Sequence, residues 1–172
     1  MTDLIPVLET PRLTLRAPAL SDLETLTAFY ASERSHMVGG PQDEMGTFTK
    51  LTARIGQWAL LGYGLWHIDD RDSGDFLGWA GILHPPAWDE PELGWTVFAQ
   101  GEGKGLAYEA ATAARAYAAQ HLNCDRPISY IRADNTRSAA LATRLGAVHE
   151  RDGAVLGIPC QIWRHPSALE AA

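Results

Sequence analysis

One ten-residue stretch, FAQGEGKGLA at residues 98–107, decides how this chain folds and where its chemistry lies. It follows a segment with strand character, residues 92–98, and opens an alanine-rich segment, residues 106–120, with high helix propensity. Three glycines in five residues let the backbone take positive φ angles and approach a ligand closely. The start of a helix leaves N–H groups unpaired and carries partial positive charge, so the stretch predicts a phosphate or pyrophosphate site.

The loop does not match the common nucleotide-binding motifs. A Walker A loop is excluded because Lys104 is followed by Gly105 and Leu106, and no G-x-G-x-x-G pattern can be drawn through the three glycines. A tight strand-to-helix turn without any ligand remains the alternative interpretation.

Periodicity and turn signals predict the other elements on both sides of this loop. Before it we expect strands at 12–16, 63–68 and 76–83, helices at 21–30 and 44–61, and a loop at 32–42. After it we expect a strand at 128–133, a helix at 135–145, and strands at 148–151 and 158–164 separated by Asp152-Gly153. Ser21 to Glu24 reads as a capping box, and Phe48, Leu51, Ile55 and Trp58 as the apolar face of the second helix.

The predicted order is β-α-α-β-β-β-α-β-α-β-β. Short connections make the middle strands antiparallel, whereas the strand–helix–strand unit around the glycine loop requires a parallel, right-handed crossover. The expected fold class is therefore mixed α/β (α+β), with a central sheet of about seven strands flanked by about four helices. We see no linker, and we expect one domain over residues 1–172.

Composition and charge exclude several classes of protein. The net charge of −7 argues against a nucleic-acid partner, and no apolar run is long enough to cross a membrane. The N-terminal residues lack a signal-peptide pattern, and we expect Cys124 and Cys160 to be reduced thiols of a cytoplasmic protein. The six histidines form no ligand pattern, so we predict no metal.

Several motifs together resemble one known family. Gln100-x-x-Gly103-x-Gly105 resembles the Q/R-x-x-G-x-G/A loop of the GCN5-related N-acetyltransferase (GNAT) superfamily. Three further segments, in the expected order, are similar to its RimJ/RimL-like ribosomal-protein-type branch: TPRLTLR at 10–16, ELGW at 92–95 and DNTRS at 134–138. The resemblance covers residues of about 10–164, and it implies the GNAT fold and acetyl-CoA as co-substrate.

The resemblance also implies which residues hold the cofactor. The amides of the glycine loop and the charge of Lys104 would bind the pyrophosphate, and the pantetheine arm would lie along residues 96–98. An amide near Val97 would then stabilise the thioester oxyanion. The full set implied is Thr96, Val97, Phe98, Gln100, Gly101, Gly103, Lys104, Gly105, Leu106, Asn135 and Ser138.

Two residues carry the catalytic roles that the resemblance implies. Glu92 would be the general base, directly or through water, because apolar neighbours would raise its pKa. Ser138 would hydrogen-bond or protonate the leaving thiolate. The tyrosine that many members use as acid is absent, since Leu141-Ala142 occupies its place. An exposed strand-edge glutamate and an ordinary first-turn serine are the alternative interpretations.

We therefore expect transfer of an acetyl group from acetyl-CoA to an amine by direct attack in a ternary complex. The acceptor stays open: a protein N-terminus, or a small-molecule amine such as a polyamine, an amino-acid derivative or an aminoglycoside-like compound. Trp88 and the loop at 36–40 are candidates for its pocket. We expect no partner beyond acetyl-CoA and the acceptor, and a monomer or homodimer. A non-catalytic acyl-CoA sensor and a nucleotide-phosphate enzyme are the alternatives.

Overall fold

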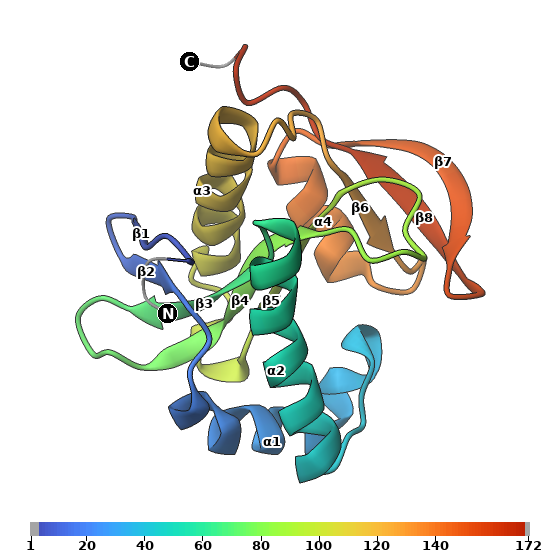
Figure 1. Cartoon of the computed structure of the whole chain (residues 1–172). Helices are drawn as coiled ribbons and strands as arrows, with labels where there is room; N and C mark the ends of the chain where they lie inside the picture. Colours follow the sequence, from blue (N-terminus) through green and yellow to red (C-terminus); the bar gives the residue numbers. More distant parts are fainter. Residues whose placement is uncertain (1–3, 171–172) are drawn as a thin grey trace.

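The computed structural model describes residues 4–170, which form one eight-stranded sheet with helices on both faces (Figure 1). The strands are β1 (Leu8–Glu9), β2 (Leu13–Arg16), β3 (Leu65–Asp70), β4 (Phe76–Leu83), β5 (Glu92–Val97), β6 (Ile128–Ile131), β7 (Val148–Val155) and β8 (Ile158–Arg164). The α-helices are α1 (Leu23–Ala31), α2 (Glu44–Leu61), α3 (Leu106–His121) and α4 (Thr136–Arg144). None of the helices in this part of the chain combines the length and apolar character needed to span a bilayer.

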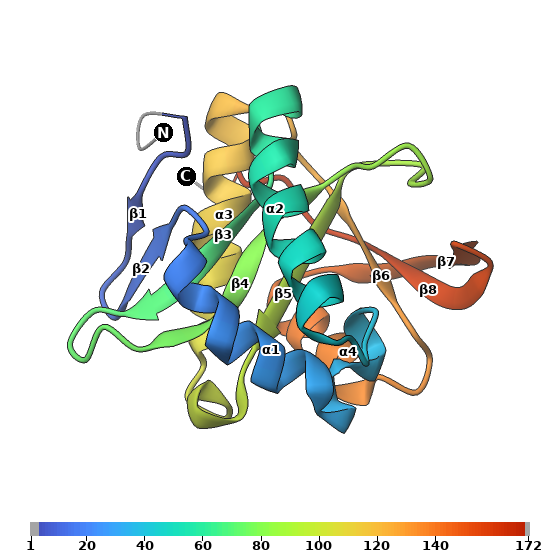
Figure 2. The ribbon, with the colours of Figure 1, turned by 60° about the horizontal axis from the view of Figure 1, so that its bottom comes forward.

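The sheet order is β1-β2-β3-β4-β5-β6-β8-β7. All neighbours are antiparallel except β5 and β6, which α3 connects as a parallel crossover. Helices α1 and α2 pack on one face, and α3 and α4 on the other (Figure 2). The predicted mixed sheet and its four flanking helices are confirmed.

The main hydrophobic core includes the surface where α3 crosses β4 and β5. Ala110, Ala111, Ala114 and Ala118 of α3 are fully buried, and their small side chains let the helix approach the sheet closely. A second, aromatic cluster lies on the opposite face, where Phe29 and Tyr30 of α1 pack on Trp79 and Phe98. The two clusters pack against opposite faces of the sheet and together fix the position of β5.

Three details at the sheet edges differ from the prediction. A short strand, β1, pairs with β2 and makes the count eight rather than seven. Strand β7 runs through Asp152-Gly153, and the chain reverses at Leu156 and Gly157, which both have positive φ. Gly153 does not form the turn; it leaves room for the neighbouring strand, since a Cβ at this position would lie 2.7 Å from Ile162 Cδ1.

The region of α1 and α2 also differs from the prediction in several details. The predicted capping box at Ser21 does not form; α1 follows a 3₁₀ turn, and Asp22 is buried, where it accepts hydrogen bonds from Arg16 and the Ala19 N–H. The predicted loop contains a 3₁₀ helix, Glu33–Val38. In α2, Leu51 and Trp58 are buried as predicted, but Phe48 is exposed and Arg54 is buried. Asp22 and Arg54 can be buried because both are hydrogen-bonded there, and such pairing cannot be read from apolar periodicity.

Candidate functional site

Strands β5 and β6 separate after a single residue pair, and this gap forms the centre of the site. The one parallel pair is Glu92 with Ile128, and the Ser129 hydroxyl then donates to the Leu93 carbonyl at 2.6 Å. The Phe98 N–H donates toward β4, to the Leu77 carbonyl at 2.7 Å. Because peptide groups alternate sides along a strand, the N–H groups of residues 95 and 97 face the gap.

Two cavities meet at this gap. The first has a volume of about 470 Å³ and lies toward α2, and the second, of about 700 Å³, lies toward the starts of α3 and α4. Both volumes are typical of small-molecule sites. The residues that line both cavities are Met37, Val38, Trp95, Thr96, Asn135 and Ser138.

The glycine loop opens into the second cavity. Gly103 and Gly105 take φ angles of 73° and 77°, and a Cβ on Gly103 would meet no atom within 4 Å. Within residues 4–170 the N–H groups of Gly103, Lys104 and Gly105 have no protein acceptor. Arg12 fixes the loop from outside, since its Nη1 donates to the Lys104 carbonyl at 2.8 Å. The loop is thus a preformed set of free donors at a helix N-terminus.

Most of the predicted cofactor residues line this second cavity, and three do not. The residues found there are Thr96, Val97, Gly101, Gly103, Gly105, Leu106, Asn135 and Ser138. Phe98 is buried in the aromatic cluster, because the chain turns into a 3₁₀ helix directly after it. The Gln100 amide lies 3.4 Å from the Phe76 carbonyl, and Lys104 is exposed outside the cavity.

Three arginines line the second cavity: Arg137 belongs to the DNTRS segment, where a phosphate contact and a plain surface arginine are the two interpretations, whereas no sequence motif marks Arg34 or Arg144. Arg34, Arg137 and Arg144 line it, and the first two form ion pairs with Glu102. The Arg144 guanidinium lies 5.1 Å from the centre of the Tyr108 ring. Glu33, Glu102 and Asp134 line the same cavity, so its charges balance. Within residues 4–170, Arg144 is the arginine of this set that forms no ion pair with a carboxylate.

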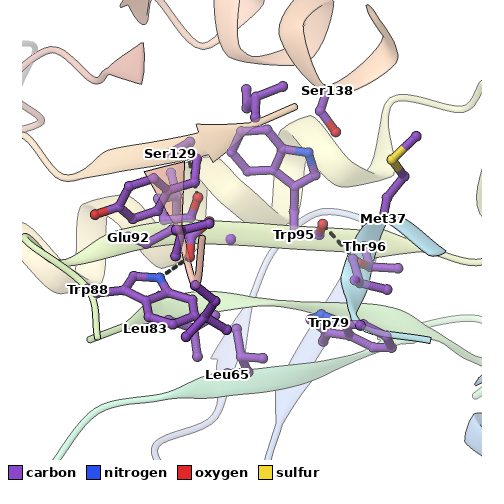
Figure 3. A pocket seen from close by; sticks show the side chains of 18 of the residues that line it. Met37, Leu65, Trp79, Leu83, Trp88, Glu92, Trp95, Thr96, Ser129 and Ser138 are labelled. Carbon is purple, nitrogen blue, oxygen red and sulfur yellow. Dashed lines mark hydrogen bonds between the residues drawn. The ribbon is translucent and has the colours of Figure 1, made fainter. Parts of the chain in front are cut away.

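Glu92 lies in the wall of the first cavity. Its Oε2 accepts a hydrogen bond of 2.5 Å from Trp88 Nε1 (Figure 3). The centres of the Trp88 and Tyr130 rings are 6.0 Å apart. Burial raises the pKa of Glu92 to about 7, although hydrogen bonds from Trp88 and the Tyr130 backbone lower it. Figure 3 shows Glu92 at one end of the cavity and Thr96 at the other. Gly94 between them leaves that stretch of the strand without a side chain.

Asn135 and Ser138 stand at the N-terminus of α4, beside the gap. The Asn135 side chain caps the helix by accepting the Ser138 N–H at 3.1 Å. Ala142 is fully buried in a cluster with Ile131 and Ala147, so this position offers no proton donor. Ser138, in contrast, lines both cavities.

Sequence reasoning missed a buried polar network beside the first cavity. Arg54 Nη1 lies 2.8 Å from His67 Nε2, Nη2 donates to the Tyr30 hydroxyl at 3.0 Å, and the guanidinium lies 3.9 Å from the centre of the Trp79 ring. His67 Nδ1 in turn lies 2.6 Å from Asp22. The helical pattern gave no signal for this, because arginines at such positions are usually solvated.

The family model of the acetyltransferase (GNAT) domain matches residues 12–148. The chain belongs to the GNAT acetyltransferase family. An acetyltransferase from Agrobacterium tumefaciens is 37% identical, with 94% of each chain covered and a TM-score of 0.87. A protein from Bordetella pertussis described as a GNAT-family acetyltransferase is 28% identical over 93% of this chain and 99% of that one, with a TM-score of 0.79.

The ribosomal L7/L12 alpha-N-protein acetyltransferase RimL, solved with coenzyme A, shares the fold at 17% identity and a TM-score of 0.74, with 93% and 96% of the two chains covered. The family resemblance seen in the sequence is confirmed, and this GNAT protein is an acetyl-CoA-dependent N-acetyltransferase.

Proposed function

We propose that the second cavity binds acetyl-CoA, with the pyrophosphate on the glycine loop and the pantetheine arm in the gap between β5 and β6. The observation that carries this proposal is the set of unpaired N–H groups at Gly103, Lys104 and Gly105, which open into a cavity that continues to the gap. The dipole of α3 adds attraction for an anion at the same point. Arg144, which lines this cavity without a carboxylate partner among the described residues, supplies a further positive charge.

In this proposal the first cavity holds the acceptor amine, and Glu92 is its base. An amine must lose its proton before it attacks the thioester, and a carboxyl group whose pKa is about 7 suits that role at neutral pH. Glu92 and Thr96 are four residues apart on one strand face, or about 13 Å between Cα atoms. The proton therefore reaches Glu92 through water above Gly94.

The remaining steps use groups at the gap. The Val97 N–H donates to the carbonyl oxygen of the thioester as negative charge develops there. The C–N bond forms, the C–S bond breaks, and the leaving thiolate takes a proton from Ser138 or from water. The presence of buried Ala142 favours Ser138 as the proton donor, because residue 142, where other members of the family have a tyrosine, cannot donate a proton.

The acceptor is an amine of either a protein N-terminus or a small molecule. The likeness to RimL lies below the identity at which a substrate can be carried over, so it supports only the general reaction. The alternative is an acyl-CoA sensor on the same scaffold.

Calorimetry with acetyl-CoA, followed by a thiol-release assay against a panel of amines, tests the proposal. Binding with release of coenzyme A in the presence of at least one amine is the expected result. Binding without any turnover favours the sensor, and absence of binding refutes the proposal.

A further inference from the structure

Two cations on one face of α2 line the first cavity. Lys50, Ala53, Arg54 and Gln57 all face it, at the i, i+3, i+4 and i+7 spacing of a single helix stripe. Gln57 is engaged in the fold, because its side-chain amide donates to the Tyr63 and Ile82 carbonyls. Lys50 and Arg54 are one turn apart and carry the same charge, which by itself opposes folding of the helix.

The fold does not neutralise this pair. Within residues 4–170 neither cation forms a direct ion pair with a carboxylate. Asp22 and Asp69 both accept hydrogen bonds from Arg16, and the His67 ring lies between Asp22 and Arg54, so the remaining negative charge acts on Arg54 without a direct contact. Lys50 has no such compensation: its Nζ lies 5.5 Å from the centre of the Tyr30 ring.

The two cations lie close to the point of transfer. The Trp79 ring, on which the Arg54 guanidinium rests, belongs to the residue paired with Thr96 across β4 and β5. Thr96 lines both cavities, so the cations stand beside the junction where the amine must meet the thioester. Among the described residues, the charged side chains that line the first cavity are Lys50, Arg54 and Glu92.

We propose that the acceptor is a small amine that also carries a carboxylate, and that Lys50 and Arg54 bind this carboxylate while the amine lies at Thr96. The inference rests on the proposed function of the two cavities. Arg54 is 8% exposed and uses two of its five N–H donors on Tyr30 and His67, which leaves donors for a carboxylate. A polyamine or an aminoglycoside would bring further positive charge to this wall and be repelled.

Matched substrate pairs test this inference. Each natural amino acid is assayed by thiol release beside its carboxamide, together with spermidine and peptides that begin with the same residues. For the amino acids that are accepted, we expect kcat/KM of the free acid to exceed that of the amide by roughly 10- to 100-fold, the range for a charge-assisted hydrogen bond. Equal rates for acid and amide, or a preference for spermidine or peptides, would overturn the inference.

The variant Lys50→Gln tests whether the preference for the free acid depends on this face of α2. It should raise KM for the free acid roughly tenfold or more, and leave KM for the amide and the affinity for acetyl-CoA unchanged. The preference for the free acid over the amide should therefore shrink, whereas Lys50→Arg should retain that preference. Arg71→Gln removes one exposed positive charge near the β3–β4 turn and serves as the control. Equal losses for acid and amide in Lys50→Gln would contradict a carboxylate site.

If no panel member is acetylated, the same amino acids are tested for thermal stabilisation of the protein saturated with coenzyme A. Stabilisation that Lys50→Gln removes supports the inference, and absence of stabilisation overturns it. Failure of acetyl-CoA to bind would instead refute the proposed function. Binding of acetyl-CoA with turnover of neutral amines alone would refute only the carboxylate site.

Discussion

Replacement of Glu92 by glutamine should make the protein more stable and nearly inactive at the same pH. The carboxylate form of Glu92 is disfavoured by burial, so its pKa rises from the ordinary 4.5 to about 7. A glutamine keeps the size of the side chain and an oxygen that can accept the hydrogen bond from Trp88 Nε1. It removes the negative charge, whose burial in the cavity wall destabilises the folded state.

The size of the effect on stability follows from the pKa shift. A rise from 4.5 to about 7 corresponds to roughly 3 kcal/mol at most. Below pH 4.5 both the folded and unfolded states are protonated at Glu92, and the penalty is absent. It grows between pH 4.5 and 7 and is complete above pH 7. We expect Glu92→Gln to raise the free energy of unfolding by about 1–3 kcal/mol at pH 8, a Tm increase of roughly 3–10 °C, and by little at pH 4.

Activity should move in the opposite direction. In the wild type kcat should rise with pH through about 7 as Glu92 loses its proton. The glutamine variant should lose this acidic limb and roughly 100-fold or more in kcat, with acetyl-CoA affinity unchanged.

Thermal unfolding at pH 4 and pH 8, with a pH–rate profile by thiol release, measures both effects. Glu90→Gln is the control: Arg164 holds the pKa of Glu90 below its usual range, so its loss should destabilise the fold instead. A persistent acidic limb in Glu92→Gln, or an equal Tm change at both pH values, would refute the reasoning.

Two further substitutions test the cofactor side. Gly103→Val should weaken acetyl-CoA binding at least tenfold in calorimetry, because a side chain would enter the space of the phosphates, while Gly74→Val, at a similar φ of 76° in the β3–β4 turn, should lose comparable stability without affecting binding. Equal affinities in the two variants would remove the loop from the cofactor site. Ser138→Ala should lower kcat roughly tenfold at unchanged acetyl-CoA affinity, and Thr143→Ala, an exposed hydroxyl of the same helix, should not. An unchanged kcat for Ser138→Ala would leave water as the proton donor.

The order of elements could be predicted from local signals. The apolar run at 76–83 and the alanine content of 106–121 are local features of the sequence, and β4 and α3 form there as predicted. Gly103 and Gly105 do adopt the positive φ angles that glycine permits. The turn at Leu156-Gly157 was missed, because an Asp-Gly pair in β7 gave the stronger local turn signal and only packing against Ile162 keeps Gly153 in the strand.

The loop–helix junction and the parallel crossover that it requires follow from local sequence signals alone. The position of Lys50 and Arg54 in the wall of the first cavity follows only from tertiary packing. Lys50 and Arg54 are 42 and 38 positions before Glu92 along the chain, and periodicity reports only which residues of one element share a face. Whether a polar stripe meets water, a carboxylate or a cavity depends on the element packed against it, and here β4 and β5 leave α2 facing a cavity.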